Sequence, residues 1–262
     1  MSVFTSMRLA FLLVSFLGTM PLLSWGQAQT LGLEQILTRM DQARAADHDH
    51  SVAYMVTREY HLTAQGAGQA DSEVVAQVNF TPPGAKDYTI FKSQGGDRAT
   101  GIVRKVLDQE SSMAGHTQSH EVSTQNYSIA LAGRENIDGH DCYVLQLTPK
   151  RDTVELVRGK AWVDARSFEL RRIAGKTAKS PSFWIKNLDV TVNYDEVKGV
   201  WLQTSTQATA DVRIAGPHVL TSRELDVQTA TFSASAQTSA KATNRRLNAH
   251  RTVADTATWV PR

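Results

Sequence analysis

The sequence predicts an α+β fold in which two helices accompany one antiparallel sheet. Residues 126–175 alternate apolar and polar side chains, which is the period of strands with one buried face. The breaks in this stretch are short, and short breaks join neighbouring strands antiparallel. Residues 31–47 and 99–113 instead repeat their apolar side chains at the spacing of an amphipathic helix. The pattern over the whole chain indicates roughly nine to eleven strands.

The N-terminus has the layout of a secretory signal peptide. Arg8 precedes an apolar run from Leu9 to Trp25, and Gly26-Gln27-Ala28 offers small residues for cleavage. We therefore predict that residues 1–28 are a signal peptide. A membrane anchor is the alternative, which is disfavoured because the run contains Pro21 and is shorter than the ~20 residues that a span needs.

The first elements after the signal follow in order. A helix over 31–47 is predicted from the spacing of its apolar residues, with Thr30 as its N-cap. Three strands at 52–62, 74–80 and 86–92 then alternate with turns rich in glycine and proline. The second helix, 99–113, carries Asp108 and Glu110, which we interpret as solubilising charge on its outer side.

The alternating stretch 126–175 has predicted breaks at 134–139, 149–153 and 164–167. Further strands are predicted at 183–194, 200–208 and 218–227, with a short piece at 212–214 and a turn over 195–199.

Residues 231–262 are predicted to be a disordered basic tail, which leaves 29–230 as the folded domain. The tail is rich in Ala, Ser, Thr and Gln and cannot bury enough apolar surface to offset the entropy of ordering. Basic residues gather there, whereas the domain has slightly more acidic than basic residues. This distribution does not fit a nucleic-acid-binding protein.

Sequence motifs for catalysis are missing. There is no G-x-S-x-G, no H-E-x-x-H and no phosphate-binding glycine loop. Asp47-His48-Asp49-His50 is interpreted as a solvated stretch after the first helix, and the single Cys142 as a small buried side chain within a strand. We therefore expect no enzymatic activity, no cofactor and no metal site.

Several motifs resemble those of a known family. They are G-R-E-N-I-D-G at 133–139, C-Y-V-L at 142–145, T-P-K at 148–150 and G-K-A-W-V-D at 159–164. Together with the order of elements over residues 31–227, they resemble the outer-membrane lipoprotein-sorting family, the LolA-like periplasmic lipoprotein carriers. None of these motifs is catalytic.

The resemblance implies an incomplete antiparallel β-barrel of about eleven strands, with helices covering its concave face. It further implies a soluble, monomeric carrier in the periplasm that shields the acyl chains of lipoproteins or free lipid for sorting to the outer membrane. Inner- or outer-membrane proteins would be its partners. The alternatives are a regulatory or sensory lipid-binding protein of the envelope that acts through a membrane partner, and a scaffold that assembles through its sheet edges. Fold alone does not choose among these functions.

The inward-facing rows of the predicted strands would line the lipid site, and apolar residues of the two helices would close it. Periodicity alone also fits an ordinary solid core, and the resemblance is what favours a cavity. An arginine on an early strand reaches the lid in the family's carriers, and Arg58, in the row of Val56 and Tyr60, is the candidate for that role here. The predicted lining is Val52, Tyr54, Val56, Val74, Val78, Phe80, Ile90, Tyr143, Leu145, Leu147, Trp162, Phe168, Leu170, Leu188, Val190 and Val192. The predicted lid is Leu33, Ile36, Leu37, Met40, Val103, Val106 and Leu107, with Arg58.

Overall fold

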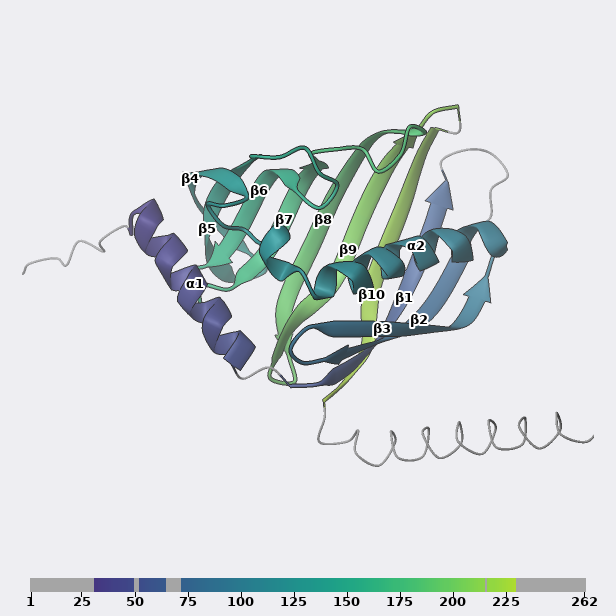
Figure 1. Ribbon diagram of the computed structural model, residues 1–262, viewed down its shortest axis with the longest axis horizontal. Coiled ribbons are helices and arrows are strands. Elements are labelled where there is room, and N and C mark those ends of the chain that lie inside the picture. Colours follow the sequence, from purple (N-terminus) through teal and green to yellow (C-terminus); the bar gives the residue numbers. More distant parts are fainter. Residues whose placement is uncertain (1–30, 50–51, 65–71, 215, 230–262) are drawn as a thin grey trace, which may run out of the picture. The chain divides into compact units, whose positions relative to one another are not determined.

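The computed structural model describes residues 31–49, 52–64, 72–214 and 216–229 (Figure 1). The predicted signal peptide 1–28 and tail 231–262 lie outside these ranges. None of the helices in the described part is long and apolar enough to span a membrane. The elements are α1 (Leu33–Asp49), β1 (Tyr54–Ala64), β2 (Ser72–Thr81), β3 (Ala85–Gln94), α2 (Asp97–Ala114), η1 (Thr117–Ser119), β4 (Tyr127–Ile137), β5 (His140–Pro149), β6 (Val157–Asp164), β7 (Leu170–Thr177), β8 (Ile185–Val197), β9 (Val200–Val212) and β10 (Gly216–Thr229).

All ten strands of the described part form one sheet, in the order β3-β2-β1-β10-β9-β8-β7-β6-β5-β4. Every neighbouring pair is antiparallel. The sheet is open, because β3 and β4 end it and no pairing joins them. The predicted α+β class is confirmed, as are an open antiparallel sheet and two long helices. The strand count is ten instead of about eleven, because residue 212 ends β9 and no separate strand forms at 212–214.

Two predicted turns are shorter in the structure. β4 continues to Ile137, so only Asp138 and Gly139 make the turn that we predicted over 134–139. Arg134 pairs with Asp141, and Glu135 accepts a hydrogen bond from the indole of Trp162 at 2.8 Å, so these charged residues belong to strands. Likewise β8 continues to Val197, beyond the predicted start of the turn at residue 195.

The register fixes which residues share a face of the sheet. One row runs across nine strands through paired residues, and we call the face that carries it the inner face. It consists of Val74, Tyr60, Ser222, Thr206, Val192, Ile173, Ala161, Leu145 and Leu131.

Helix α2 packs on part of this inner face. Its residues Ala99, Val103 and Leu107 are buried, at the i, i+4 spacing that places side chains on one side of a helix. Val103 and Leu107 belong to one core cluster with strand residues from β1, β2, β9 and β10. Figure 1 shows α2 crossing this side of the sheet. The face that the resemblance implied to be hollow is therefore filled by α2 over these strands.

Helix α1 packs near the turn between β6 and β7. The guanidinium of Arg39 lies 5.0 Å from the ring centroid of Phe168, and that ring stacks on Tyr143 at 6.1 Å. Ile36 and Met40 are buried beside them on α1. The end of α1 contains Asp47 to Asp49, so these residues are helical and do not follow the helix as predicted.

Candidate functional site: the inner face and its helix

A buried ion pair joins α2 to the sheet. The Arg58 side chain, on β1, is only 2% exposed, and its Nη1 lies 2.8 Å from Oε2 and 3.0 Å from Oε1 of Glu110 on α2. Lys86 Nζ, on β3, lies 2.8 Å from Oε1 of the same carboxylate. Two cations from two strands therefore hold one carboxylate of the helix.

The positive charges of Arg58 and Lys86 determine the protonation state of the Glu110 carboxylate. Burial alone would raise the pKa of Glu110, but the charges and hydrogen bonds of Arg58 and Lys86 outweigh burial and lower the pKa to about 2. Burial alone would lower the pKa of Arg58, but the charge and hydrogen bonds of Glu110, together with Tyr60, outweigh burial and raise that pKa. Both groups are thus charged at neutral pH, and the contact is an ion pair.

Acid is expected to weaken this contact within a defined pH range. The pKa of Glu110 lies below its ordinary value of 4.5, so the pair contributes stability fully above pH 4.5 and loses it as the pH falls to about 2. The loss should be about 3 kcal/mol of unfolding free energy. Urea unfolding at pH 7, 4.5 and 2.5 measures it.

The Glu110→Gln variant is the control for this pH series, because other carboxylates also titrate in the range. Its unfolding free energy should fall less between pH 4.5 and 2.5 than that of the parent. An equal fall in both proteins would show that Glu110 does not contribute.

Other buried polar atoms lie close to the ion pair. Arg58 Nε, the Tyr60 hydroxyl and Glu224 Oε2 have no hydrogen-bond partner in the described part of the chain. Glu224 pairs with Arg58 in the ladder between β1 and β10, and Tyr60 follows on the same strand face. Burying unpaired polar groups is costly, so a polar centre lies within the apolar inner face.

Beyond α2 the inner face carries further apolar side chains, interspersed with Thr206, Ser222 and His218, and it is not fully covered. One row of residues paired across the strands runs from Leu220 through Ala208 and Val190 to Gly175. In the neighbouring row on the same face, Leu188 pairs with Ala210. Their side chains are half-buried, in contrast to those under α2. We call these six side chains of β8, β9 and β10 the inner strip: Leu188, Val190, Val192, Ala208, Ala210 and Leu220.

A pair of glycines adjoins the inner strip. Gly159 and Gly175 face one another across β6 and β7, and Gly175 is paired with Val190. A Cβ added to Gly175 would lie 2.7 Å from the Cα of Gly159, and its φ is +153°. The two strands therefore approach closely, and this row carries no side chains beside Val190.

Most of the predicted lining residues lie together on the sheet. Those that the structure buries are Val56, Val74, Val78, Tyr143, Leu145, Leu147 and Phe168. Those that remain half-buried are Tyr54, Phe80, Ile90, Leu170, Leu188, Val190 and Val192. Of the predicted lid, Ile36, Leu37, Met40, Val103 and Leu107 are buried and Leu33 is half-buried.

Three predicted residues have other surroundings. Trp162 lies between Ala161 and Val163, which are buried, and its indole donates to the exposed Glu135, so it belongs to the opposite face. Val52 precedes β1 and is exposed, and Val106 is exposed on α2. Trp162 is therefore on the wrong face of its strand for the predicted lining, Val52 lies before its strand begins, and Val106 is on the uncovered side of α2.

Sequence reasoning missed Glu110, which we had interpreted as a solubilising charge. It lies three residues after Leu107, on the side of α2 that packs on the sheet, and this spacing was visible in the sequence. The presence of a basic residue, Arg58, in an apolar strand row was the matching signal.

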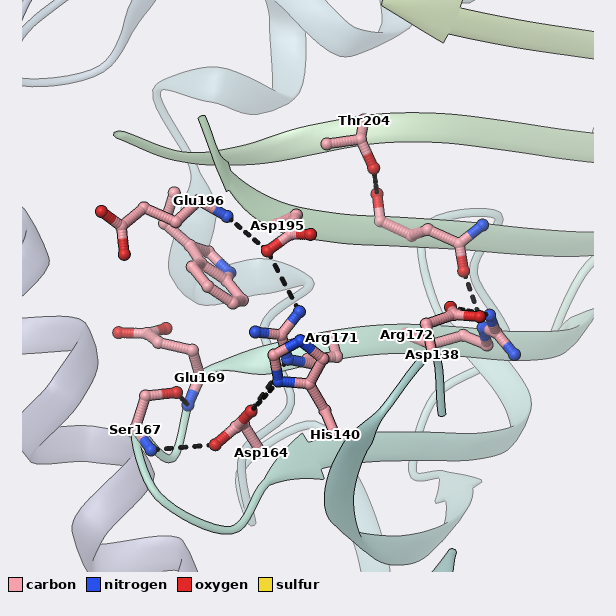
Figure 2. A network of polar contacts seen from close by, with 12 residues as sticks. Asp138, His140, Asp164, Ser167, Glu169, Arg171, Arg172, Asp195, Glu196 and Thr204 are labelled. Atoms are coloured by element: carbon pink, nitrogen blue, oxygen red, sulfur yellow. Dashed lines mark hydrogen bonds and ion pairs between the residues drawn. The ribbon is translucent and has the colours of Figure 1, made fainter. Parts of the chain in front are cut away.

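A polar network occupies a different part of the sheet, near the β4–β5 turn (Figure 2). Arg171 Nε donates to Asp164 at 2.9 Å and its Nη1 to Asp195 at 3.0 Å, while a ring nitrogen of His140 lies 3.2 Å from Asp164. Burial alone would raise the pKa of Asp164, but hydrogen bonds from Arg171 and two backbone N–H groups lower it to about 2. Arg172 similarly donates to Asn193 at 2.6 Å. The arginines are thus matched by acceptors of the protein itself, which fits a structural network.

Two pockets of the described part are lined mainly by polar residues. One, of about 350 Å³, lies between α1 and residues 121–125, and the other, of about 110 Å³, lies beside the Figure 2 network. Neither includes a strand residue of the predicted lining. The candidate site is therefore the inner face with its helix α2. Within the described chain, it is the only apolar region that matches the predicted site.

Comparison with known proteins gives a family model and several solved structures. A family model described as an uncharacterized protein matches residues 103–229, and no curated protein matches the chain. A structure of a DUF1329 family protein from Desulfovibrio piger is 14% identical, with a TM-score of 0.36, and the match covers 76% of this chain and 92% of that one.

Two further structures bear the family names that the resemblance implied. A LolA superfamily protein from Nitrosomonas europaea is 15% identical, with a TM-score of 0.35, over 76% of this chain and 94% of that one. An outer membrane lipoprotein-sorting protein domain from Vibrio parahaemolyticus is 13% identical, with a TM-score of 0.40 and the same coverage.

Proposed function

We propose that the protein binds the acyl chains of lipids or lipoproteins on the inner face of its sheet, with α2 as a movable cover. The inner strip is the observation that carries this proposal. In a solid core the inward side chains would be buried, whereas Leu188 and Val190 remain half-buried beside the cluster under α2, and Leu220 is only partly covered by packing against it. An apolar ligand laid along them would remove that surface from water.

Movement of α2 would extend the site over the neighbouring strands. Lifting Val103 and Leu107 off the sheet costs roughly 1.5–3 kcal/mol for each side chain. Each methylene of a ligand that leaves water returns about 0.8 kcal/mol, so about four to eight methylenes offset the two side chains alone. Lifting α2 also separates Glu110 from Arg58, so further methylenes are needed to offset the loss of this ion pair. A long acyl chain meets this requirement and a short one does not.

We further propose that the protein is secreted into the periplasm and carries lipid or lipoprotein toward the outer membrane. The apolar start of the chain before Ala28 supports export. The ion pair between Arg58 and Glu110 supports a closed state of α2 that a ligand can displace.

Binding of a fluorescent long-chain fatty acid tests the proposal. The protein should bind the probe saturably at micromolar concentrations, and hexadecanoate but not hexanoate should displace it. Val190→Glu should weaken binding at least tenfold, because a carboxylate on the inner strip is incompatible with an acyl chain.

The neighbouring residue supplies the matched control. Thr191 follows Val190 on β8 and therefore faces the other side of the sheet. Thr191→Glu should leave probe binding unchanged. Absence of saturable binding, or equal binding by the two variants, would contradict the proposed function.

A further inference from the structure

Three large apolar side chains are exposed together at one end of the sheet. Phe183 is 74% exposed and Trp184 is 58% exposed just before β8, and Ile214 is 97% exposed just after β9. The ladder between these strands pairs Ile185 with Val212, and the Arg213 amide donates to the Trp184 carbonyl at 2.7 Å. The three residues are therefore neighbours, and we call them the apolar tip.

The conformation of the apolar tip keeps these side chains in solvent. The Phe183 and Trp184 rings meet edge to face, with centroids 5.6 Å apart, so each covers only part of the other. Ile214 has φ +74°, which is an outlier for a β-branched residue. The chain thus holds an isoleucine outward at a strained turn, where glycine or asparagine would fit without strain.

Basic residues lie close to the apolar tip in the sequence. Lys179, Lys186 and Arg213 are exposed, and the adjoining segments 179–186 and 211–214 contain one acidic residue, Asp211. The Arg213 guanidinium lies 4.8 Å from the Phe183 ring centroid, and its Nε donates to the Phe183 carbonyl at 2.8 Å. Tryptophan and phenylalanine beside lysine and arginine are the residues that anchor proteins at the membrane interface.

We propose that the apolar tip docks on an anionic lipid bilayer. Phe183, Trp184 and Ile214 would enter the boundary between headgroups and acyl chains, where an indole is favourably placed. Lys179, Lys186 and Arg213 would contact lipid phosphates, since their charge complements an anionic surface. This docking goes beyond acyl-chain binding by the inner strip and does not depend on it.

Vesicle binding by the full chain tests the docking, because segments outside 31–229 contribute equally to all variants. The parent protein should bind vesicles of phosphatidylcholine with one quarter phosphatidylglycerol more tightly than vesicles of phosphatidylcholine alone. Phe183→Ser with Trp184→Ser and Ile214→Ser should weaken binding to the anionic vesicles at least tenfold. Lys179→Glu with Lys186→Glu should reduce the preference for anionic lipid, while the contribution of Arg213 and of the segments outside 31–229 remains.

Phe91 provides the matched control, since it is an aromatic residue on β3 that is 58% exposed, like Trp184. Phe91→Ser should bind vesicles as the parent does. The docking proposal is overturned if the triple variant binds the anionic vesicles as tightly as the parent does. It is likewise overturned if the triple variant loses binding to a protein partner while its vesicle binding is unchanged. Unchanged fatty-acid binding by the triple variant would separate this result from the proposed function.

A second measurement does not rely on a disruptive variant. Brominated lipids quench tryptophans that enter the bilayer, so anionic vesicles containing them should quench part of the parent's fluorescence. Trp184→Phe should bind the vesicles but lose this quenching. Quenching that is the same in Trp184→Phe and the parent would place Trp184 outside the bilayer and overturn the proposal.

Discussion

Arg58→Ala is expected to lower the unfolding free energy by about 3–5 kcal/mol, because it leaves a buried carboxylate short of its main partner. Glu110 would keep only Lys86, and the space of the arginine side chain would be lost as well. Urea unfolding followed by circular dichroism at pH 7 measures the change.

An exposed pair in the same sheet is the control for Arg58→Ala. Lys92 and Glu73 lie 2.6 Å apart on β3 and β2, with the lysine side chain 46% exposed. Lys92→Ala should cost less than about 1 kcal/mol. The double variant Arg58→Leu with Glu110→Leu removes both charges together and should recover most of the stability. A similar cost for Arg58→Ala and Lys92→Ala would mean that the ion pair does not hold α2.

Gly175→Ala is expected to destabilise the sheet by about 3 kcal/mol or more, since strain and crowding add. The new Cβ would lie 2.3 Å from the Arg158 carbonyl oxygen and 2.7 Å from the Gly159 Cα, at a φ of +153°. Backbone atoms of a paired strand cannot move away without breaking the ladder. Thermal unfolding of the variant measures the loss.

Gly139→Ala separates the two causes of that loss. Gly139, in the β4–β5 turn, also has positive φ, at +87°, but a Cβ there would meet nothing within 4 Å. It should therefore cost only the backbone strain, about 1–2 kcal/mol. Equal losses for Gly139→Ala and Gly175→Ala would contradict the close approach of β6 and β7.

The period of the side chains was enough to find the elements of the described chain. The apolar spacing of α1 and α2 and the alternation of β1, β2 and β5 matched the structure to within a few residues. The turn predicted from residue 134 was wrong because β4 has a solvent-exposed face there. The charged residues Arg134 and Glu135 of that face are of the same kind as those found in turns.

The candidate site was predicted less completely, because it depends on pairs of residues far apart in the sequence. The resemblance implied that Arg58 contacts the lid, but Glu110 looked like an isolated solubilising charge, and only the folded chain brings the two to 2.8 Å. The side of α2 that faces the sheet could be inferred from Ala99, Val103 and Leu107, which leaves Val106 exposed. The half-burial of Leu188 and Val190 could not be inferred, since alternation reveals a face and not what covers it.

The unjoined edges of the sheet have a mechanical consequence. In a closed ring of strands, the number of strands and their stagger fix the diameter. Here β3 and β4 are not paired with each other, so the ten-stranded sheet can curl or flatten through small changes of twist while all nine ladders stay intact. The width available beneath α2 can therefore change, and under the proposed function this would let one protein bind ligands of different sizes.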